Sequence, residues 1–76
     1  MEQPLNSVVA ELQAEFPNSS FLLLDRGAFP ISSVGNVPRH VAWSKYVPEG
    51  KTVQVMVEKR RYIVHKRQGL TLVQSS

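Results

Sequence analysis

The hydrophobic and polar positions of this chain follow a helical period at its beginning and a strand period over its second half. In the first segment, apolar residues recur at the spacing of one helical face: Leu5, Val8, Val9, Leu12 and Phe16. Pro17 should end this helix, because a residue that precedes proline is pushed out of the α conformation. We therefore predict a helix over residues 5–16 that buries its apolar face against a sheet.

About five segments after this helix have the pattern of strands. Residues 20–25 form a mostly apolar run, which is typical of a buried strand, and residues 40–47, 51–57, 61–66 and 70–74 show the alternation of half-buried strands. Residues 28–39 hold two prolines, a glycine and several small polar residues without a clear period, which predicts a loop of about a dozen residues.

This order of elements predicts one small α+β domain over residues 1–76. Its N-terminal amphipathic helix would pack on a mainly antiparallel sheet, or on a small bent barrel, of about five strands. A chain of 76 residues is long enough for one such domain and too short for two.

The segments 51–57 and 61–66 predict a long hairpin. A four-residue turn over residues 58–61 would pair Val57 with Tyr62 and Val55 with Val64. A two-residue turn at residues 59–60 gives the same pairing but needs a positive φ at both residues, which neither favours. In this register Tyr62 and Val64 point toward the helix, whereas Met56 and Ile63 lie opposite each other on the other face as candidate interface residues.

Charge is distributed very unevenly along the chain. Residues 1–25 carry four acidic residues and no Lys or Arg, a net charge of −4, whereas residues 26–76 carry nine basic and two acidic residues, a net charge of +7. Five of the nine basic residues fall within the nine positions 59–67. This layout predicts an acidic face and a basic face.

The basic hairpin is the best candidate for a binding site, because a polyanion is bound by several cations that neutralise phosphates together. The candidate nucleic-acid-binding residues are Lys59, Arg60, Arg61, Lys66, Arg67, Arg39, Lys45 and Tyr46. Tyr46 is included because it is the better candidate for stacking on a base, whereas Trp43 is expected in the core. The alternative interpretation is a solvated hairpin tip whose charges keep an edge strand from aggregating.

The residue types present argue against several other kinds of site. The chain has no cysteine, and its two histidines cannot by themselves complete a structural zinc site, so we predict no metal and no cofactor. No nucleotide-binding or hydrolase motif occurs, which favours a protein that is not an enzyme. The longest apolar run, residues 21–24, is too short to span a membrane, and residues 1–2 do not begin a secretory signal, so we expect a cytoplasmic protein.

From the sequence we therefore predict a small non-enzymatic nucleic-acid-binding or regulatory protein of the phage or bacterial accessory kind, which binds DNA or RNA through its hairpin. The alternative is a protein-interaction or oligomerisation module. In that case the hairpin and the edge strands would bind an acidic protein partner or a second copy of the chain. The hairpin register, which decides which face carries the charge, stays open at this level.

Overall fold

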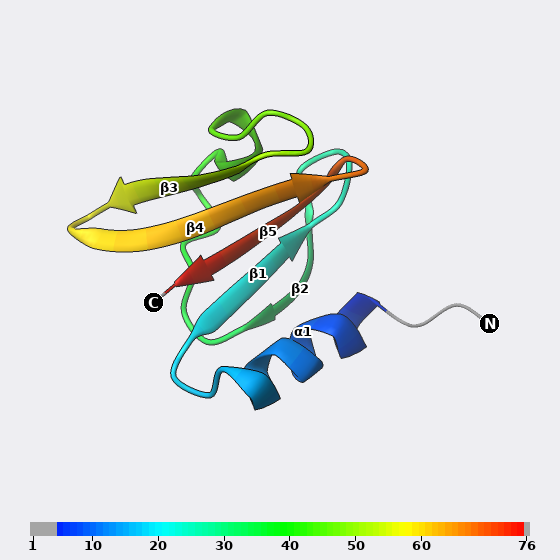
Figure 1. The fold of residues 1–76 in the computed structure, drawn as a ribbon, viewed down its shortest axis with the longest axis vertical. Coiled ribbons are helices and arrows are strands. Elements are labelled where there is room, and N and C mark those ends of the chain that lie inside the picture. The colour runs from blue at the N-terminus through cyan, green and yellow to red at the C-terminus, as the bar shows by residue number, and fades with distance from the viewer. Residues whose placement is uncertain (1–4, 76) are drawn as a thin grey trace.

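In the computed structural model, which describes the backbone of residues 5–75 and the side chains of residues 9–75, a helix and a five-stranded antiparallel sheet form one α+β unit (Figure 1). The elements are α1 (Leu5–Glu15), β1 (Ser20–Leu24), β2 (Pro30–Val34), the 3₁₀ helix η1 (Trp43–Lys45), β3 (Thr52–Val57), β4 (Arg60–Arg67) and β5 (Leu70–Ser75). The strand order is β2-β1-β5-β4-β3, so β2 and β3 are edges and the sheet does not close into a barrel.

Helix α1 forms where the apolar period predicted it and packs on β1 and β2. Val9 is fully buried against Phe21 and Leu23, with Leu12 packed beside them. The helix ends at Glu15, two residues before Pro17. Phe16 was expected on the buried face but is 44% exposed, because it lies beyond the last helical turn. The predicted contributions of Leu5 and Val8 lie outside the described side chains.

The middle of the chain differs from the prediction, because β2 lies inside the expected loop. Asp25 explains the difference: its Oδ1 accepts hydrogen bonds from the N–H groups of Gly27 at 2.8 Å and Phe29 at 2.9 Å. This tight turn folds the chain back, so that Pro30–Val34 pairs with β1. Proline is tolerated at the start of β2 because this strand is an edge.

The predicted strand over residues 40–47 is wrong, because these residues cross the sheet and contain η1. Trp43 and Val47 are both buried, and their spacing of four residues fits a helical turn as well as a strand. The indole Nε1–H of Trp43 donates to the carbonyl of Pro38 at 2.7 Å, which holds the irregular backbone in place. We call residues 35–51 the crossing segment.

Tyr62 and Val64 face the crossing segment and not the helix, which corrects the predicted orientation of the hairpin. Alternation along β1 sends Phe21 and Leu23 to the helix and Leu22 to the opposite face, and the register through β5 puts Tyr62 and Val64 on the side of Leu22. The Tyr62 ring lies 4.9 Å from that of Trp43, centroid to centroid, which confirms Trp43 as a core residue. Each face of the sheet therefore has its own apolar cluster.

The hairpin has a tighter turn than the predicted one. Val57 pairs with Arg60 and Val55 with Tyr62, and the turn consists of Glu58 and Lys59 alone, with φ of 52° and 68°. Both residues adopt the positive φ that a two-residue turn with the twist of the sheet requires. The observed register differs from the predicted one by two residues, so the residues that share a face were predicted correctly. Met56, however, lies opposite Arg61 and not opposite Ile63.

Candidate nucleic-acid interface

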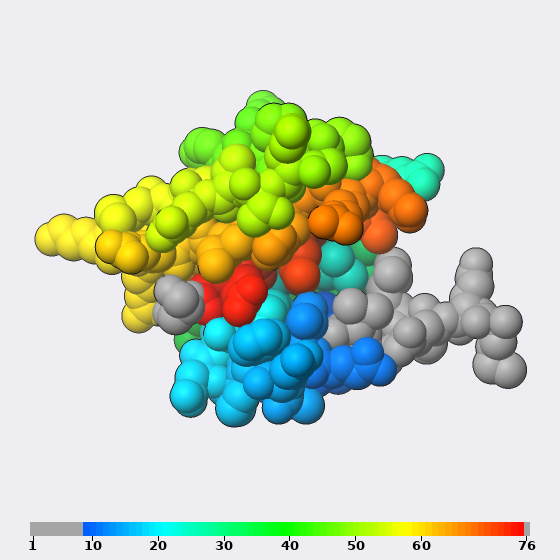
Figure 2. Space-filling view, in the orientation of Figure 1, coloured from blue at the N-terminus to red at the C-terminus, as the bar shows by residue number. Residues whose placement is uncertain are grey.

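The end of the β3–β4 hairpin projects beyond the rest of the sheet. Strand β5 pairs with β4 only as far as the partners Tyr62 and Ser75, so within the described chain residues 57–61 form a ribbon of two strands alone. Figures 1 and 2 show this ribbon, in yellow, extending past the ends of the neighbouring strands. We call residues 57–61 the ribbon tip.

The ribbon tip concentrates positive charge on exposed side chains. Lys59, Arg60 and Arg61 are all exposed, and Glu58 is the one acidic residue among the five of the tip. The acidic residues Glu11 and Glu15 lie on α1, which packs against β1 and β2 at the other side of the sheet. The acidic helix and the basic ribbon tip are therefore separated in space, whereas the other basic residues lie elsewhere on the molecule.

Arg60 and Arg61 point to opposite faces of the ribbon, because successive residues of a strand alternate. Arg60 shares the face of Tyr62 and of the crossing segment, whereas Arg61 lies opposite Met56 on the face that carries α1. Among the described residues, helix α1 contacts β1 and β2 but neither β3 nor β4, and Met56 is 65% exposed. Lys59 sits in the turn between the two faces.

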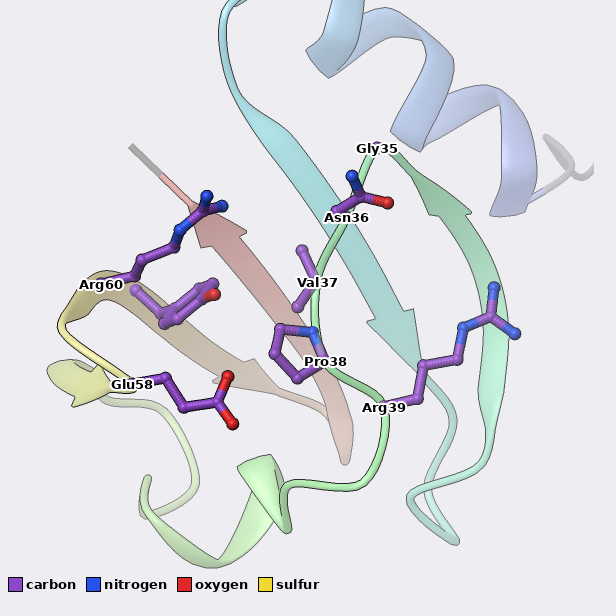
Figure 3. A pocket seen from close by; sticks show the side chains of 8 residues that line it. Gly35, Asn36, Val37, Pro38, Arg39, Glu58 and Arg60 are labelled. Carbon is purple, nitrogen blue, oxygen red and sulfur yellow. The ribbon is translucent and has the colours of Figure 1, made fainter.

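On the Arg60 face, the ribbon tip and the crossing segment enclose an open hollow of about 590 Å³. The residues that line it are Gly35, Asn36, Val37, Pro38, Arg39, Glu58, Arg60 and Tyr62. In Figure 3, Arg39 and Arg60 extend on opposite sides of the backbone that carries Val37 and Pro38, and Glu58 points toward Pro38. The Arg39 guanidinium donates to the hydroxyl of Ser33 at 2.6 Å, which orients it along β2. The two arginines therefore flank the hollow and do not converge on one point.

The remaining predicted binding residues lie at the other end of the hairpin. Lys66 is half-buried, and its Nζ donates to the carbonyl of Ser44 at 3.4 Å. Lys45 and Tyr46 follow Ser44 directly and are exposed there, Tyr46 to 52%. Arg67 is exposed on the face of α1. The structure thus places Arg39 and Arg60 at the same hollow, keeps Lys59 and Arg61 on the ribbon tip beside Arg60, and separates these four residues from the second group.

Sequence reasoning missed the polar residues Asn36 and Glu58 at the hollow. Asn36 was assigned to an unstructured loop, and its position became definable only with the unpredicted strand β2 that precedes it. Glu58 was placed in a longer turn. The one sequence signal at this place was the pair Gly35-Asn36. In the structure Gly35 has a φ of 78°, and a Cβ at this position would collide with the Ser20 side chain. Glycine is therefore required where the chain leaves β2.

Several other candidate features have structural roles or are absent from the described chain. Asp25 has a structural role, because its Oδ1 accepts two backbone hydrogen bonds in the β1–β2 turn. No group of three potential metal ligands occurs among the described residues. None of the helices in the described part of the chain has the length and apolar character needed to cross a membrane.

Comparisons of the chain with protein-family models, with curated proteins and with solved structures find no match.

Proposed function

We propose that this protein binds nucleic acid non-enzymatically by inserting the ribbon tip into a groove or along a phosphate backbone. The observation that carries the proposal is the projection of Lys59, Arg60 and Arg61 on a two-stranded ribbon clear of the acidic helix. A two-stranded β-ribbon fits the major groove of duplex DNA in width. A small accessory or regulatory protein of a phage or bacterium is the kind of protein in which we place this function.

The two faces of the ribbon support distinct contacts in this proposal. Arg60 and Arg39 flank one hollow without converging, so in this proposal they contact separate phosphates and do not clamp a single one. Arg61, on the opposite face, reaches the other wall of a groove. Asn36 and Glu58, which line the hollow between the arginines, supply polar groups that can contact sugar or base edges.

Lys66, Arg67, Lys45 and Tyr46 have a smaller part in this proposal than in the prediction from sequence. They lie at the base of the hairpin, so a ligand that contacts the ribbon tip reaches them only if it extends along β4. We therefore assign the main binding energy to Lys59, Arg60, Arg61 and Arg39.

The test is a titration of fluorescently labelled duplex DNA, single-stranded DNA and RNA of random sequence over a series of salt concentrations. Each phosphate neutralised contributes about −0.9 to the log–log slope of affinity against salt for duplex DNA, so four contacts predict a slope of about −3.6. Binding of an acidic peptide such as polyglutamate with no measurable affinity for any nucleic acid would refute the proposal in favour of an acidic protein partner.

A further inference from the structure

The edge strand β3 lacks the features that usually keep an exposed edge from pairing. Strand β4 is the one described element that contacts β3. Natural edges are commonly protected by proline, by a charged side chain or by a bulge. The other edge, β2, begins with Pro30 and packs against α1. Strand β3 has the sequence TVQVMV, with neither a proline nor a charge.

The free backbone groups of β3 can be identified from the hairpin turn. In a two-residue hairpin, the residues that flank the turn form a hydrogen-bonded pair, here Val57 and Arg60. Alternation then directs the peptide groups of Val55 and Val53 to β4 as well. The N–H and C=O groups of Thr52, Gln54 and Met56 therefore point away from the sheet.

We propose that β3 pairs antiparallel with β3 of a second copy of this chain, with Gln54 opposite Gln54 at the two-fold axis. This register is the one that uses all the outward groups. Thr52 faces Met56 of the second copy, Gln54 faces its equivalent, and Met56 faces Thr52, and each of these three pairs exchanges two hydrogen bonds. A shift by one pair in either direction brings in Gly50 or Glu58, which lie outside the strand with φ of 76° and 52°.

Side chains and charges agree with the same register. Val53 of one copy lies opposite Val55 of the other, so the half-buried valines on the face of the crossing segment extend their cluster across the axis. At each end, Glu58 of one copy comes beside Gly50 and Lys51 of the other, so opposite charges meet. A Cβ added at Gly50 would touch nothing within 4 Å, which shows that this approach is open. The shifted register that pairs Thr52 with Glu58 of the second copy would instead set Lys51 opposite Lys59, so that like charges meet.

The chain has no native cysteine, which makes the register directly testable by cross-linking. In a hydrogen-bonded antiparallel pair the Cα atoms are about 5.5 Å apart, which lies within the range of a disulfide. Gln54→Cys should therefore form a disulfide-linked dimer on mild oxidation. Thr52→Cys and Met56→Cys are matched controls, since each would lie about 14 Å from its own equivalent along the paired strands. Equal cross-linking of all three variants, or none at Gln54→Cys, would overturn the proposed pairing.

Sedimentation equilibrium of the unmodified chain gives the second measurement. We expect a concentration-dependent mass that approaches twice the 8.6 kDa of one chain. Gln54→Pro should shift the equilibrium to the monomer, because it removes an outward N–H without removing a bond to β4, and Gln54→Thr, which keeps the N–H, should not. Near-ultraviolet circular dichroism of the buried Trp43 reports whether each variant is folded. A mass of one chain at every concentration up to the millimolar range would refute the dimer, whatever the result for nucleic acid.

Discussion

Arg60 and Arg61 are adjacent in the sequence, and the structure puts their side chains on opposite faces of a projecting two-stranded ribbon. Arg60 lines a hollow together with Arg39, whereas Arg61 lies opposite the exposed Met56. The basic residues of the ribbon tip, which are consecutive in the sequence, therefore carry charge on both faces of the ribbon. This arrangement suits insertion between two walls of negative charge better than docking on one flat surface.

The turn of the ribbon tip is strained, and relieving the strain should stabilise the fold. Glu58 and Lys59 have φ of 52° and 68°, and a left-handed conformation costs roughly 1–2 kcal/mol for an ordinary L-residue. Asn-Gly is the preferred pair in a turn of this type. We expect Glu58→Asn combined with Lys59→Gly to raise the free energy of unfolding by about 1 kcal/mol in urea denaturation. An unchanged or lower midpoint would contradict the two-residue turn.

Glu49 anchors the β4–β5 turn by accepting hydrogen bonds from two successive backbone N–H groups, those of Gln68 at 2.7 Å and Gly69 at 2.8 Å. Hydrogen bonds to a charged group contribute more than neutral ones, so Glu49→Ala should lower the free energy of unfolding by about 1–2 kcal/mol. Glu49→Gln, which keeps an acceptor oxygen, should lose less. Thermal unfolding followed by circular dichroism measures both, and equal stabilities for the three proteins would show that this contact is not needed.

Thr71 is fully buried, and its hydroxyl makes no hydrogen bond with the described residues. Burying an unpaired hydroxyl costs free energy, so the isosteric change Thr71→Val should leave stability unchanged or raise it by about 1 kcal/mol. Thr71→Ser, which keeps the hydroxyl and removes the methyl group, is the control and should be less stable than both. A clear loss of stability in Thr71→Val, measured by urea denaturation, would instead mean that the hydroxyl has a partner in solution.

The proposed dimer and the proposed binding by the ribbon tip together predict the distance between the two ribbon tips on DNA. With Gln54 on the axis, the two turns lie about 31 Å apart along the paired strands, close to one turn of B-form DNA. The cross-linked Gln54→Cys dimer should therefore bind a duplex of about 20 base pairs much more tightly than one of about 10, whereas the Gln54→Pro monomer should show little preference. Electrophoretic mobility shifts measure the ratio of the affinities for the two duplexes. Equal ratios for dimer and monomer would exclude simultaneous binding by both tips.

Local pattern predicted most of the elements of this fold. The helical period placed α1, and alternation placed β3, β4 and β5 and grouped Tyr62 and Val64 on one face of the hairpin. Strand β2 was missed because Pro30, Ser32 and Ser33 carry no hydrophobic period, and because its pairing depends on the Asp25 turn. Residues 40–47 were misassigned because the spacing of Trp43 and Val47 fits a strand and a helical turn equally well.

The orientation of the hairpin could not be predicted because it depends on which layer covers which face. A chain with one helix suggested one core, but the crossing segment builds a second core around Trp43 on the other face. The hollow between Arg39 and Arg60 exists only because that segment returns over β4. Its position is a tertiary result, whereas the cations that surround it were visible in the sequence.

The most direct test of the binding proposal is the salt dependence of nucleic-acid affinity in two charge-matched variants. Arg60→Ala/Arg61→Ala removes two cations from the ribbon tip. Arg26→Ala/Lys51→Ala removes two exposed cations at the opposite end, where the Arg26 Nε–H donates to the carbonyl of Gln68 and the backbone carbonyl of Lys51 accepts from the N–H of Lys66. Both variants are made in the monomeric Gln54→Pro background, so that loss of the Lys51 contact between copies does not enter the comparison.

We predict that the tip variant reduces the log–log slope by about 2, while the control keeps the slope of the Gln54→Pro protein to within about half a unit. Equal slopes for the two variants would show that binding follows net charge alone and would contradict the assigned role of the ribbon tip.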